Sequence, residues 1–424
     1  MSISKAKLKK ELWQKAEKAL YALYGDMPDI RILNRFVSEK LNFEYSILLW
    51  DILGEIRLRA KENDYITTLP GTLSSCFAAY LLGTSDINPL PLHYLCPVCK
   101  RMEFVSDKAL PWDMQDKPCG CGAMMRADGF DIPYEMNRPA RHFVSLTVDQ
   151  DFLKTAEEII REQTSGLYRI CKLTKPDFAI LKFVLLPFNG EPDFEENIDT
   201  VDNKYEHYPQ ITITPCHISK TANNLYRATG IHFDEIAIGA SKSFLSDSRI
   251  IEAFANGNID NIPNFKSNSL NMGEALCLAK PRNCYDLLQF LGAMHGTNTW
   301  CNNAERLIRN GICSIGDIPA HRDDVFMLLR DKLREAGLSD LSFADYFAHK
   351  ARHGMYALGG IRWEERELLN HLNLPEWFIP YVEKIEYMTS KSNSISSLRI
   401  ALAFMWYKVN YPEVFNRIKK DFCV

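Results

Sequence analysis

The hydrophobic and polar positions divide the chain into a helical start, a mixed middle and a long helical end. Apolar residues recur at helical spacing through residues 1–62, with one break at Gly25-Asp26-Met27-Pro28. From about residue 244 onward the spacing is again helical. Between these two regions, short apolar or alternating runs predict strands at 143–148, 178–186 and 211–214. We therefore expect an α+β fold.

The run at 143–148 alternates strictly between apolar and polar residues. Successive side chains of a strand point to opposite faces, so this pattern places one face of the strand in the core. Val144, Leu146 and Val148 should point inward, and Ser145 and Thr147 should line the opposite, polar face. Further along, the acidic stretch 191–207 is typical of an exposed loop.

Four cysteines form the clearest candidate metal site. Cys96 and Cys99 are separated by two residues, and nineteen residues later Cys119 and Cys121 are separated by one. Four thiolates complete a tetrahedral zinc site that leaves no position for water or substrate, so the ion would be structural. The short second spacer leaves open the alternative that the cysteines stay reduced without an ion. His93 could replace one ligand or could simply pack before a strand.

Composition and charge exclude several classes of protein. An apolar fraction of 46% and a net charge of −4 are ordinary for a globular chain and argue against a generally basic nucleic-acid binder. No run reaches the roughly 18 apolar residues of a membrane span, and residues 1–18 lack the apolar centre of a signal peptide. We expect a cytoplasmic protein without membrane contact. The lysines of residues 5–18 are either a solvated helix face or a nucleic-acid contact.

Several ordered segments resemble one known family. They are Ala16-Glu17-Lys18-Ala19, Asn88 to Tyr94, Cys96-Pro97-Val98-Cys99, Asp128 to Glu135, His295-Gly296-Thr297, Pro375-Glu376-Trp377 and Lys384 to Met388. Through these segments the chain resembles the palm and fingers of the PolC-type (C-family) alpha subunit of bacterial DNA polymerase III.

The resemblance implies a nucleotidyltransferase-type palm with an antiparallel-rich sheet and a zinc-knuckle insertion, followed by a helical fingers region. The family's exonuclease, phosphoesterase-like, thumb and duplex-binding parts have no counterpart in these 424 residues. The regions we expect are a helical palm entrance at 1–91, the knuckle at 92–135, the palm sheet at 136–243 and the fingers at 244–424.

The resemblance also indicates where catalytic carboxylates should stand. The family carries an Asp-x-Asp pair on one palm strand and a third Asp on a neighbouring strand. The corresponding positions here are Ser145, Thr147 and Thr229. Hydroxyls are poor ligands for the two hard divalent cations that phosphoryl transfer needs, so magnesium is not expected at the palm. Displaced carboxylates remain an alternative, namely Asp149, Asp151, Asp234 and Glu235.

The resemblance assigns the family's phosphate loop to residues 68–75. Here Pro70 stands in place of an arginine, and only Gly71, Thr72, Ser74 and Ser75 keep the small or hydroxyl character of that loop. The same residues could instead form an ordinary Ser/Thr helix cap.

In the fingers, Lys391 keeps a cation but lacks the nearby histidine of the family. His295 could act as a general acid, although we favour the interpretation that it lies at the start of a helix.

Our leading hypothesis is a catalytically silent PolC-like protein, because the chain keeps the motifs of the family's architecture and lacks its metal ligands. Its partner would be a replisome protein or primer–template DNA. The two alternatives are a nucleotidyltransferase that uses displaced carboxylates and a nonspecific nucleic-acid binder that uses the lysines of residues 5–18.

Overall fold

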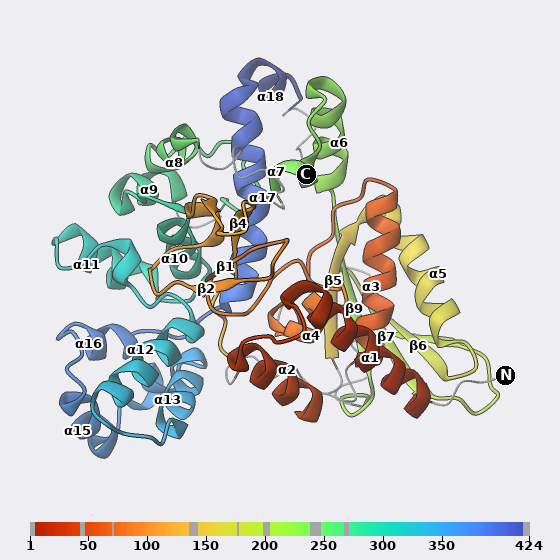
Figure 1. Ribbon diagram of the computed structural model, residues 1–424, viewed down its shortest axis with the longest axis horizontal. Helices are drawn as coiled ribbons and strands as arrows, with labels where there is room; N and C mark the ends of the chain where they lie inside the picture. The colour runs from red at the N-terminus through yellow and green to blue at the C-terminus, as the bar shows by residue number, and fades with distance from the viewer. Residues whose placement is uncertain are drawn as a thin grey trace. The chain divides into compact units, whose positions relative to one another are not determined.

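The computed structural model describes residues 5–42, 47–69, 72–134, 143–175, 178–197, 204–237, 247–266 and 271–418 (Figure 1). The chain divides into two compact units. The first comprises residues 1–104, 117–126 and 137–230, and the second comprises residues 105–116, 127–136 and 231–424. Sheets and helices make up the first unit, whereas a long helical region follows in the second, so the α+β fold is confirmed. No helix within the described ranges is both long and apolar enough to cross a bilayer.

A five-stranded sheet organises the first unit. Its strand order is β5-β9-β7-β6-β8, and the strand predicted at 178–186 is β7, in the middle of the sheet. The β9–β7 and β7–β6 pairs are antiparallel, whereas β5–β9 and β6–β8 are parallel, so the sheet is mixed rather than antiparallel throughout. The strands are β5 (Phe143–Asp149), β6 (Tyr168–Lys175), β7 (Phe178–Pro187), β8 (Phe194–Asn197) and β9 (Gln210–Cys216).

The sequence predicted an exposed loop over the acidic stretch 191–207, but part of this stretch is a strand. Residues Phe194–Asn197 form β8 and pair with β6. The pairing is possible because basic residues of neighbouring elements offset the acidic ones: Lys172 of β6 lies 3.5 Å from Glu195, and Lys204 lies 3.1 Å from Glu196. Residues 198–203 lie outside the described ranges.

Helices cover the apolar face of this sheet. α3 (Ile47–Glu62) packs against β5, and α5 (Leu153–Thr164) packs against β6 and α3. α1 (Lys5–Tyr24) contacts α3, and α2 (Ile30–Asn42) contacts α4 (Phe77–Leu81). α6 (Ile218–Thr229) follows β9. Aromatic residues join the first helices, since the ring of Trp13 meets both Trp50 and Phe36 edge to face.

A second, smaller sheet carries the cysteines. Its order is β2-β1-β4-β3. The strands are β1 (His93–Leu95), β2 (Met102–Phe104), β3 (Lys117–Pro118) and β4 (Met124–Asp128). The turn between β1 and β2 contains Cys96 and Cys99, and the turn between β3 and β4 contains Cys119 and Cys121. Two short hairpins therefore present the four thiols.

The second unit is built around α17 (Lys391–Asn410). This helix is buried along most of its length and packs against α7, α8, α10, α12 and α18. The helices of this unit are α7 (Phe233–Ala237), α8 (Ser248–Ala255), α9 (Met272–Ala279), α10 (Cys284–His295), α11 (Glu305–Arg309), α12 (Arg322–Glu335), α13 (Ser342–Arg352), α14 (Met355–Gly359), α15 (Trp363–His371), α16 (Phe378–Val382), α17 and α18 (Pro412–Ile418).

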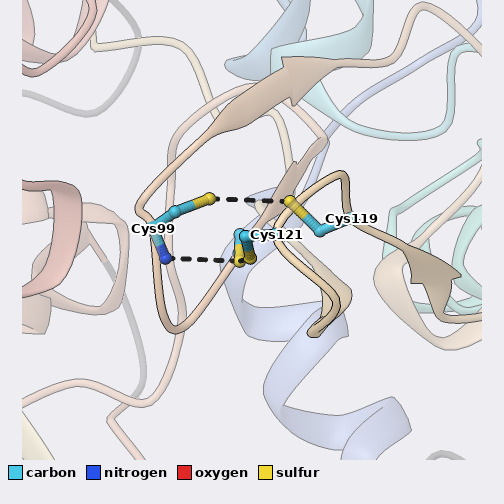
Figure 2. Close-up of side chains that lie close together, drawn as sticks. Cys99, Cys119 and Cys121 are labelled. Carbon is cyan, nitrogen blue, oxygen red and sulfur yellow. Dashed lines mark hydrogen bonds between the residues drawn. The ribbon is translucent and has the colours of Figure 1, made fainter.

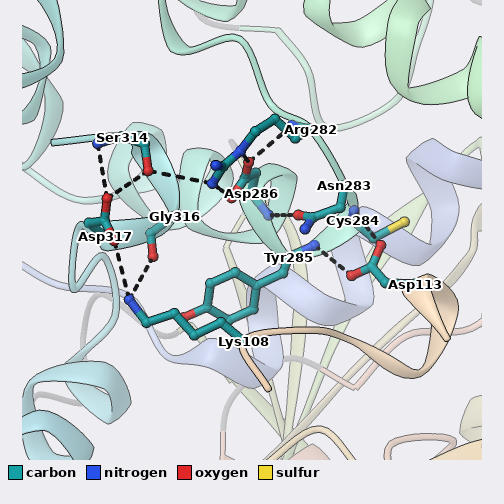
Figure 3. A network of polar contacts seen from close by, with 10 residues as sticks. All are labelled: Lys108, Asp113, Arg282, Asn283, Cys284, Tyr285, Asp286, Ser314, Gly316 and Asp317. Carbon is teal, nitrogen blue, oxygen red and sulfur yellow. Dashed lines mark hydrogen bonds and ion pairs between the residues drawn. The ribbon is translucent and has the colours of Figure 1, made fainter. Parts of the chain in front are cut away.

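A polar network ties residues 105–116 to α10 within the second unit (Figure 3). The carboxylate of Asp113 accepts hydrogen bonds from the backbone N–H groups of Cys284, at 2.7 Å, and Tyr285, at 3.1 Å. These are the first two N–H groups of α10, which have no partner inside the helix. Burial raises the pKa of Asp113, although hydrogen bonds from the backbone N–H groups of Leu110, Cys284 and Tyr285 oppose the change. Beside it, Arg282 pairs with Asp286 at 2.8 Å.

Asp113→Ala tests the importance of this contact. The substitution leaves two helix N–H groups without their acceptor, so we expect a loss of about 1–3 kcal/mol in stability. Urea unfolding followed by circular dichroism measures it. Asp107→Ala is the matched control, because Asp107 belongs to the same segment and is exposed. Equal unfolding midpoints for the two variants would show that Asp113 does not anchor α10.

Candidate functional site

The polar face of β5 lies beside a second row of hydroxyls on β9. Val144, Leu146 and Val148 are buried, while Ser145 and Thr147 are half-exposed, so the predicted alternation is present. In the parallel β5–β9 register, Ser145 lies opposite Thr212 and Thr147 lies opposite Thr214. Partners in a ladder share a face of the sheet, so these side chains form one hydroxyl-lined patch.

β7 adds a positive charge to this face. Lys182 lies opposite Thr212 in the β7–β9 register, and Thr212 lies opposite Ser145. One row across the sheet therefore carries two hydroxyls and an ammonium group. The hydroxyl oxygen of Thr212 is buried and has no hydrogen-bond partner among the residues the structure describes. An ammonium group on this face disfavours a divalent cation through charge repulsion.

Thr229 does not join this patch as the third position. We expected it on a strand next to the Ser145 and Thr147 strand, and this expectation is wrong. Thr229 is the last residue of α6, where its hydroxyl donates a 2.8 Å hydrogen bond to the carbonyl of Leu225. The strand beside β5 is β9, so Thr212 and Thr214 hold the flanking positions. Their alternation with Ile211 and Ile213 was the sequence signal that could have identified them.

Asp149 lies on the same face of β5 as Thr147 but already has other partners. One carboxylate oxygen accepts the N–H of Asp151, at 3.1 Å, and the other accepts the N–H of Ser219 near the start of α6, at 3.2 Å. Asp149 is also only 2% exposed. Its carboxylate therefore shapes the chain at the end of the strand.

Among the residues that the structure describes, the other candidate carboxylates belong to no group of three or more side chains close enough to share an ion. Asp234 and Glu235 belong to the second unit and begin α7, where Glu235 accepts the N–H of His232. Across the described ranges, the sole group of three or more Asp, Glu, His or Cys side chains close enough to share an ion is the cysteine cluster.

The residues assigned to the phosphate loop form a compact turn. Pro70 and Gly71 lie outside the described residues, and Thr72–Ser75 is a single 3₁₀ turn. Ser74 and Ser75 are 1% and 0% exposed. Their carbonyl oxygens accept hydrogen bonds from other segments, since Ser85 donates to Ser74 and Arg35 donates to Ser75. These contacts hold the turn in the interior.

A buried carboxylate occupies the helix start that follows this turn. The two oxygens of Glu39 accept hydrogen bonds from the N–H groups of Phe77 and Ala78, both at 2.8 Å. These are the first residues of α4. Arg35 pairs with Glu39 at 2.7 Å, and the Glu39 side chain is fully buried. Our reading of the sequence missed Glu39, although its spacing of four residues from Arg35 on a predicted helix signalled an ion pair.

The four cysteine sulfurs lie within 4.8 Å of one another. Figure 2 shows Cys99, Cys119 and Cys121 close together. The shortest contacts join the two hairpins, because Cys96 lies 3.5 Å from Cys121 and Cys99 lies 3.5 Å from Cys119. Tetrahedral Zn–S bonds of about 2.3 Å would set the sulfurs about 3.8 Å apart, so the cluster fits such an ion closely.

The hairpin backbones explain how both cysteine spacers reach one cluster. In the first, the N–H of Cys99 donates to the sulfur of Cys96, and the next residue, Lys100, adopts a left-handed φ of 62°. In the second, the N–H of Gly122 bonds the carbonyl of Cys119, and Gly122 has a φ of 89°. A glycine takes this conformation without steric cost, so the single-residue spacer closes in a tight turn.

Hydrogen bonding shifts the pKa values of Cys96 and Cys99 in opposite directions. The backbone N–H of Cys99, followed by that of Val98 and by the other thiols, lowers the pKa of Cys96 to about 6. The backbone N–H of Arg101 lowers the pKa of Cys99, but the neighbouring sulfurs outweigh it and raise that pKa to about 12.

His93 is not part of the cysteine cluster. It is the first residue of β1 and is fully buried. Its Nδ1 lies 2.7 Å from the carbonyl oxygen of Pro91, and its ring packs between Tyr24 and Phe104. The interpretation of His93 as a packed residue at a strand is confirmed.

The two residues assigned to the fingers lie at helix ends, Lys391 at an N-terminus and His295 at a C-terminus. Lys391 begins α17 and is 6% exposed. Its Nζ donates to the carbonyl of Asp131 at 3.3 Å and lies 3.8 Å from the carboxylate of Asp324. His295 is exposed and is the last residue of α10, so its interpretation as a residue at the start of a helix is wrong.

Comparison with known proteins identifies the relatives of the chain. No family model matches it. The chain is similar to proteins called DNA polymerase III PolC-type from three organisms. They are Caldanaerobacter subterraneus subsp. tengcongensis (25% identity over 94% of this chain), Thermotoga petrophila (26% over 93%) and Clostridium perfringens (23% over 93%). About 93% of the chain is thus similar to a region of PolC-type DNA polymerase III, as its motifs indicated. The chain spans about a third of the length of these curated relatives, 32–33%.

Glu39→Gln tests whether the α4 start depends on its internal carboxylate. We expect a loss of about 2–4 kcal/mol, less than for a wholly enclosed pair because Arg35 keeps some contact with water. The control is Glu55→Gln, which removes an exposed pair with Arg59 at the same spacing on α3. Urea unfolding compares the variants. An unchanged midpoint for Glu39→Gln would contradict the structural role assigned to this residue.

Proposed function

We propose that the chain is a catalytically inactive PolC-like polymerase homologue that acts as a binding or regulatory module in DNA replication. Its partner is primer–template DNA or a replisome protein, which it contacts or for which it competes. One observation carries the proposal: Ser145 and Thr147, at the positions that correspond to the paired aspartates, share their face of the sheet with Thr212 and Thr214.

The chemistry of phosphoryl transfer gives this observation its weight. Two divalent cations clamp the attacking and leaving oxygens, and they need anionic oxygen ligands to stay bound. Neutral hydroxyls on two adjacent strands leave most of the cation charge uncompensated. Lys182, in the same row as Ser145 and Thr212, adds an unfavourable positive charge. The chemistry of this face therefore supports the proposal that the protein binds no pair of magnesium ions there.

The segment that corresponds to the phosphate loop supports the same proposal. Backbone N–H groups at a helix start bind phosphate oxygens when they point to an open site. The first N–H groups of α4 are already bonded to Glu39, and the preceding serines are buried. A triphosphate would have to displace an internal carboxylate that is also paired with Arg35. The hydroxyl face of the sheet and the occupied start of α4 both support a protein that does not bind a nucleoside triphosphate with metal ions.

The cysteine cluster provides the structural part of the proposal. Cys96, Cys99, Cys119 and Cys121 would hold a Zn²⁺ ion, whose four thiolate bonds crosslink two short hairpins. Those hairpins have little core of their own, since β3 has two residues and β1 and β2 have three each. A closed four-thiolate site supplies folding energy rather than catalysis. Retention of this knuckle supports the proposal that the chain keeps a folded surface for binding a partner.

Cys99→Ser tests the zinc assignment. We expect one zinc ion per wild-type chain after purification without chelator and a loss of most of that metal in the variant, because three thiolates and a hydroxyl hold the ion weakly. Plasma mass spectrometry measures the content. Cys277→Ser is the control, since Cys277 is exposed and lies outside the cluster. Equal zinc content in both variants would contradict the assignment.

Primer extension tests the inactive palm. We expect no nucleotide incorporation with Mg²⁺ or Mn²⁺ at any enzyme concentration, because the hydroxyl face cannot hold the ion pair. Incorporation that disappears on Asp149→Asn or Asp234→Ala would instead establish an enzyme with displaced carboxylates and overturn the proposal.

Binding is measured on the same protein. Fluorescence anisotropy with a labelled primer–template, and co-purification with replication proteins, report the two kinds of partner. We expect a saturable complex in at least one assay. A chain that neither binds DNA nor co-purifies with any replication protein would remove the binding role.

A further inference from the structure

Two exposed histidines lie one helical turn apart at the end of α13: His349 belongs to the helix and His353 is the residue directly after it. His349 and His353 are four residues apart, and both side chains are exposed. Their ring centroids are 4.7 Å apart, with the ring planes tilted by 56°. Residues at this spacing lie on the same face of a helix, so the two imidazoles point to a common volume of solvent.

The rest of α13 fixes the backbone that carries this pair. Ala344, Phe347, Ala348 and Ala351 are buried on the opposite side of the helix. The ring of Phe347 stacks against Phe378 and contacts Tyr356 at a centroid distance of 4.5 Å. This packing holds the Cα of His349, and the backbone N–H of His353 donates a 3.2 Å hydrogen bond to the carbonyl of Lys350, so mainly the side-chain rotamers remain to be set. Such preorganisation favours a ligand that uses both rings at once.

The chemistry of two imidazoles at this spacing selects a class of ligand. Imidazole nitrogen is a favoured donor for the borderline divalent ions Zn²⁺, Ni²⁺ and Cu²⁺. Histidines at positions i and i+4 of a helix form a metal-binding pair in zinc metalloproteases. Within the described ranges no third Asp, Glu, His or Cys joins the two rings, so water would complete the coordination.

We propose that His349 and His353 form a surface chelate for a borderline divalent transition-metal ion. Two nitrogen donors bind the ion, and solvent fills its remaining positions. The site belongs to the second unit, whereas the cysteine cluster belongs to the first. It is independent of the proposed replication function and of zinc at the cysteines.

Neighbouring charges make this an open, moderate-affinity site. The ammonium of Lys350 is occupied by Glu365, at 2.9 Å, and by the hydroxyl of Tyr346, at 3.0 Å. The positive charge of Arg352, which lies next to His353, lowers the affinity for a cation. Asp345, one turn before His349, is the acidic residue of α13 and offsets part of that field.

Isothermal titration with Ni²⁺ tests the chelate. The tag-free full chain is first saturated with Zn²⁺ and freed of excess metal, so that the cysteines do not take up the added nickel. We expect the wild type to bind one Ni²⁺ per chain. His349→Ala and His353→Ala should each weaken that binding at least tenfold, because one imidazole alone loses the chelate.

His371→Ala is the matched control. His371 is also exposed in the last turn of a helix, and it lies outside the pair. This variant should bind nickel as the wild type does. Equal nickel affinity in the wild type, His349→Ala and His353→Ala would overturn the proposal, as would wild-type binding seen only at millimolar nickel. Circular dichroism confirms that each variant keeps its helical content.

Discussion

Carboxylates from distant parts of the chain cap the helix starts on which both units depend. The N-cap residues that precede α4, α6 and α17 make no side-chain capping hydrogen bond. A remote acid supplies the missing acceptor: Glu39 for α4, Asp149 for α6 and Asp323 for α17, while Asp113 reinforces α10. A carboxylate at a helix start satisfies N–H groups that lack partners and complements the positive end of the helix dipole.

These caps bear directly on function, because a helix start is also where a protein binds phosphate. The α4 start, next to the segment that resembles a phosphate loop, is filled by Glu39 with Arg35 beside it. The α17 start, where Lys391 lies, is filled by Asp323. On the sheet face that we propose as an inactive palm, Ser145 and Thr147 offer hydroxyls instead of carboxylates. In this proposal, negative charge stabilises helix starts inside the fold and is missing from the face where a metal pair would need it.

Local patterns in the sequence were enough for part of this arrangement. The alternation around Ser145 gave the correct face of β5, and the cysteine spacing gave the cluster. The ordered motifs gave the PolC-like resemblance. Long-range contacts could not be predicted in this way, since 38 residues separate Glu39 from Phe77 and 171 separate Asp113 from Cys284. Thr229 was misplaced because the sequence motif did not reveal that β9, rather than the later segment, pairs with β5.

The most direct test of the central claim is an experimental structure of the chain soaked with Mn²⁺ and a non-hydrolysable deoxynucleoside triphosphate, with manganese located by its anomalous scattering. The account predicts no manganese peak beside Ser145, Thr147, Thr212 and Thr214, and a Glu39 side chain that remains on α4. Two manganese ions bridged by acidic side chains at that face, with a triphosphate bound, would contradict it.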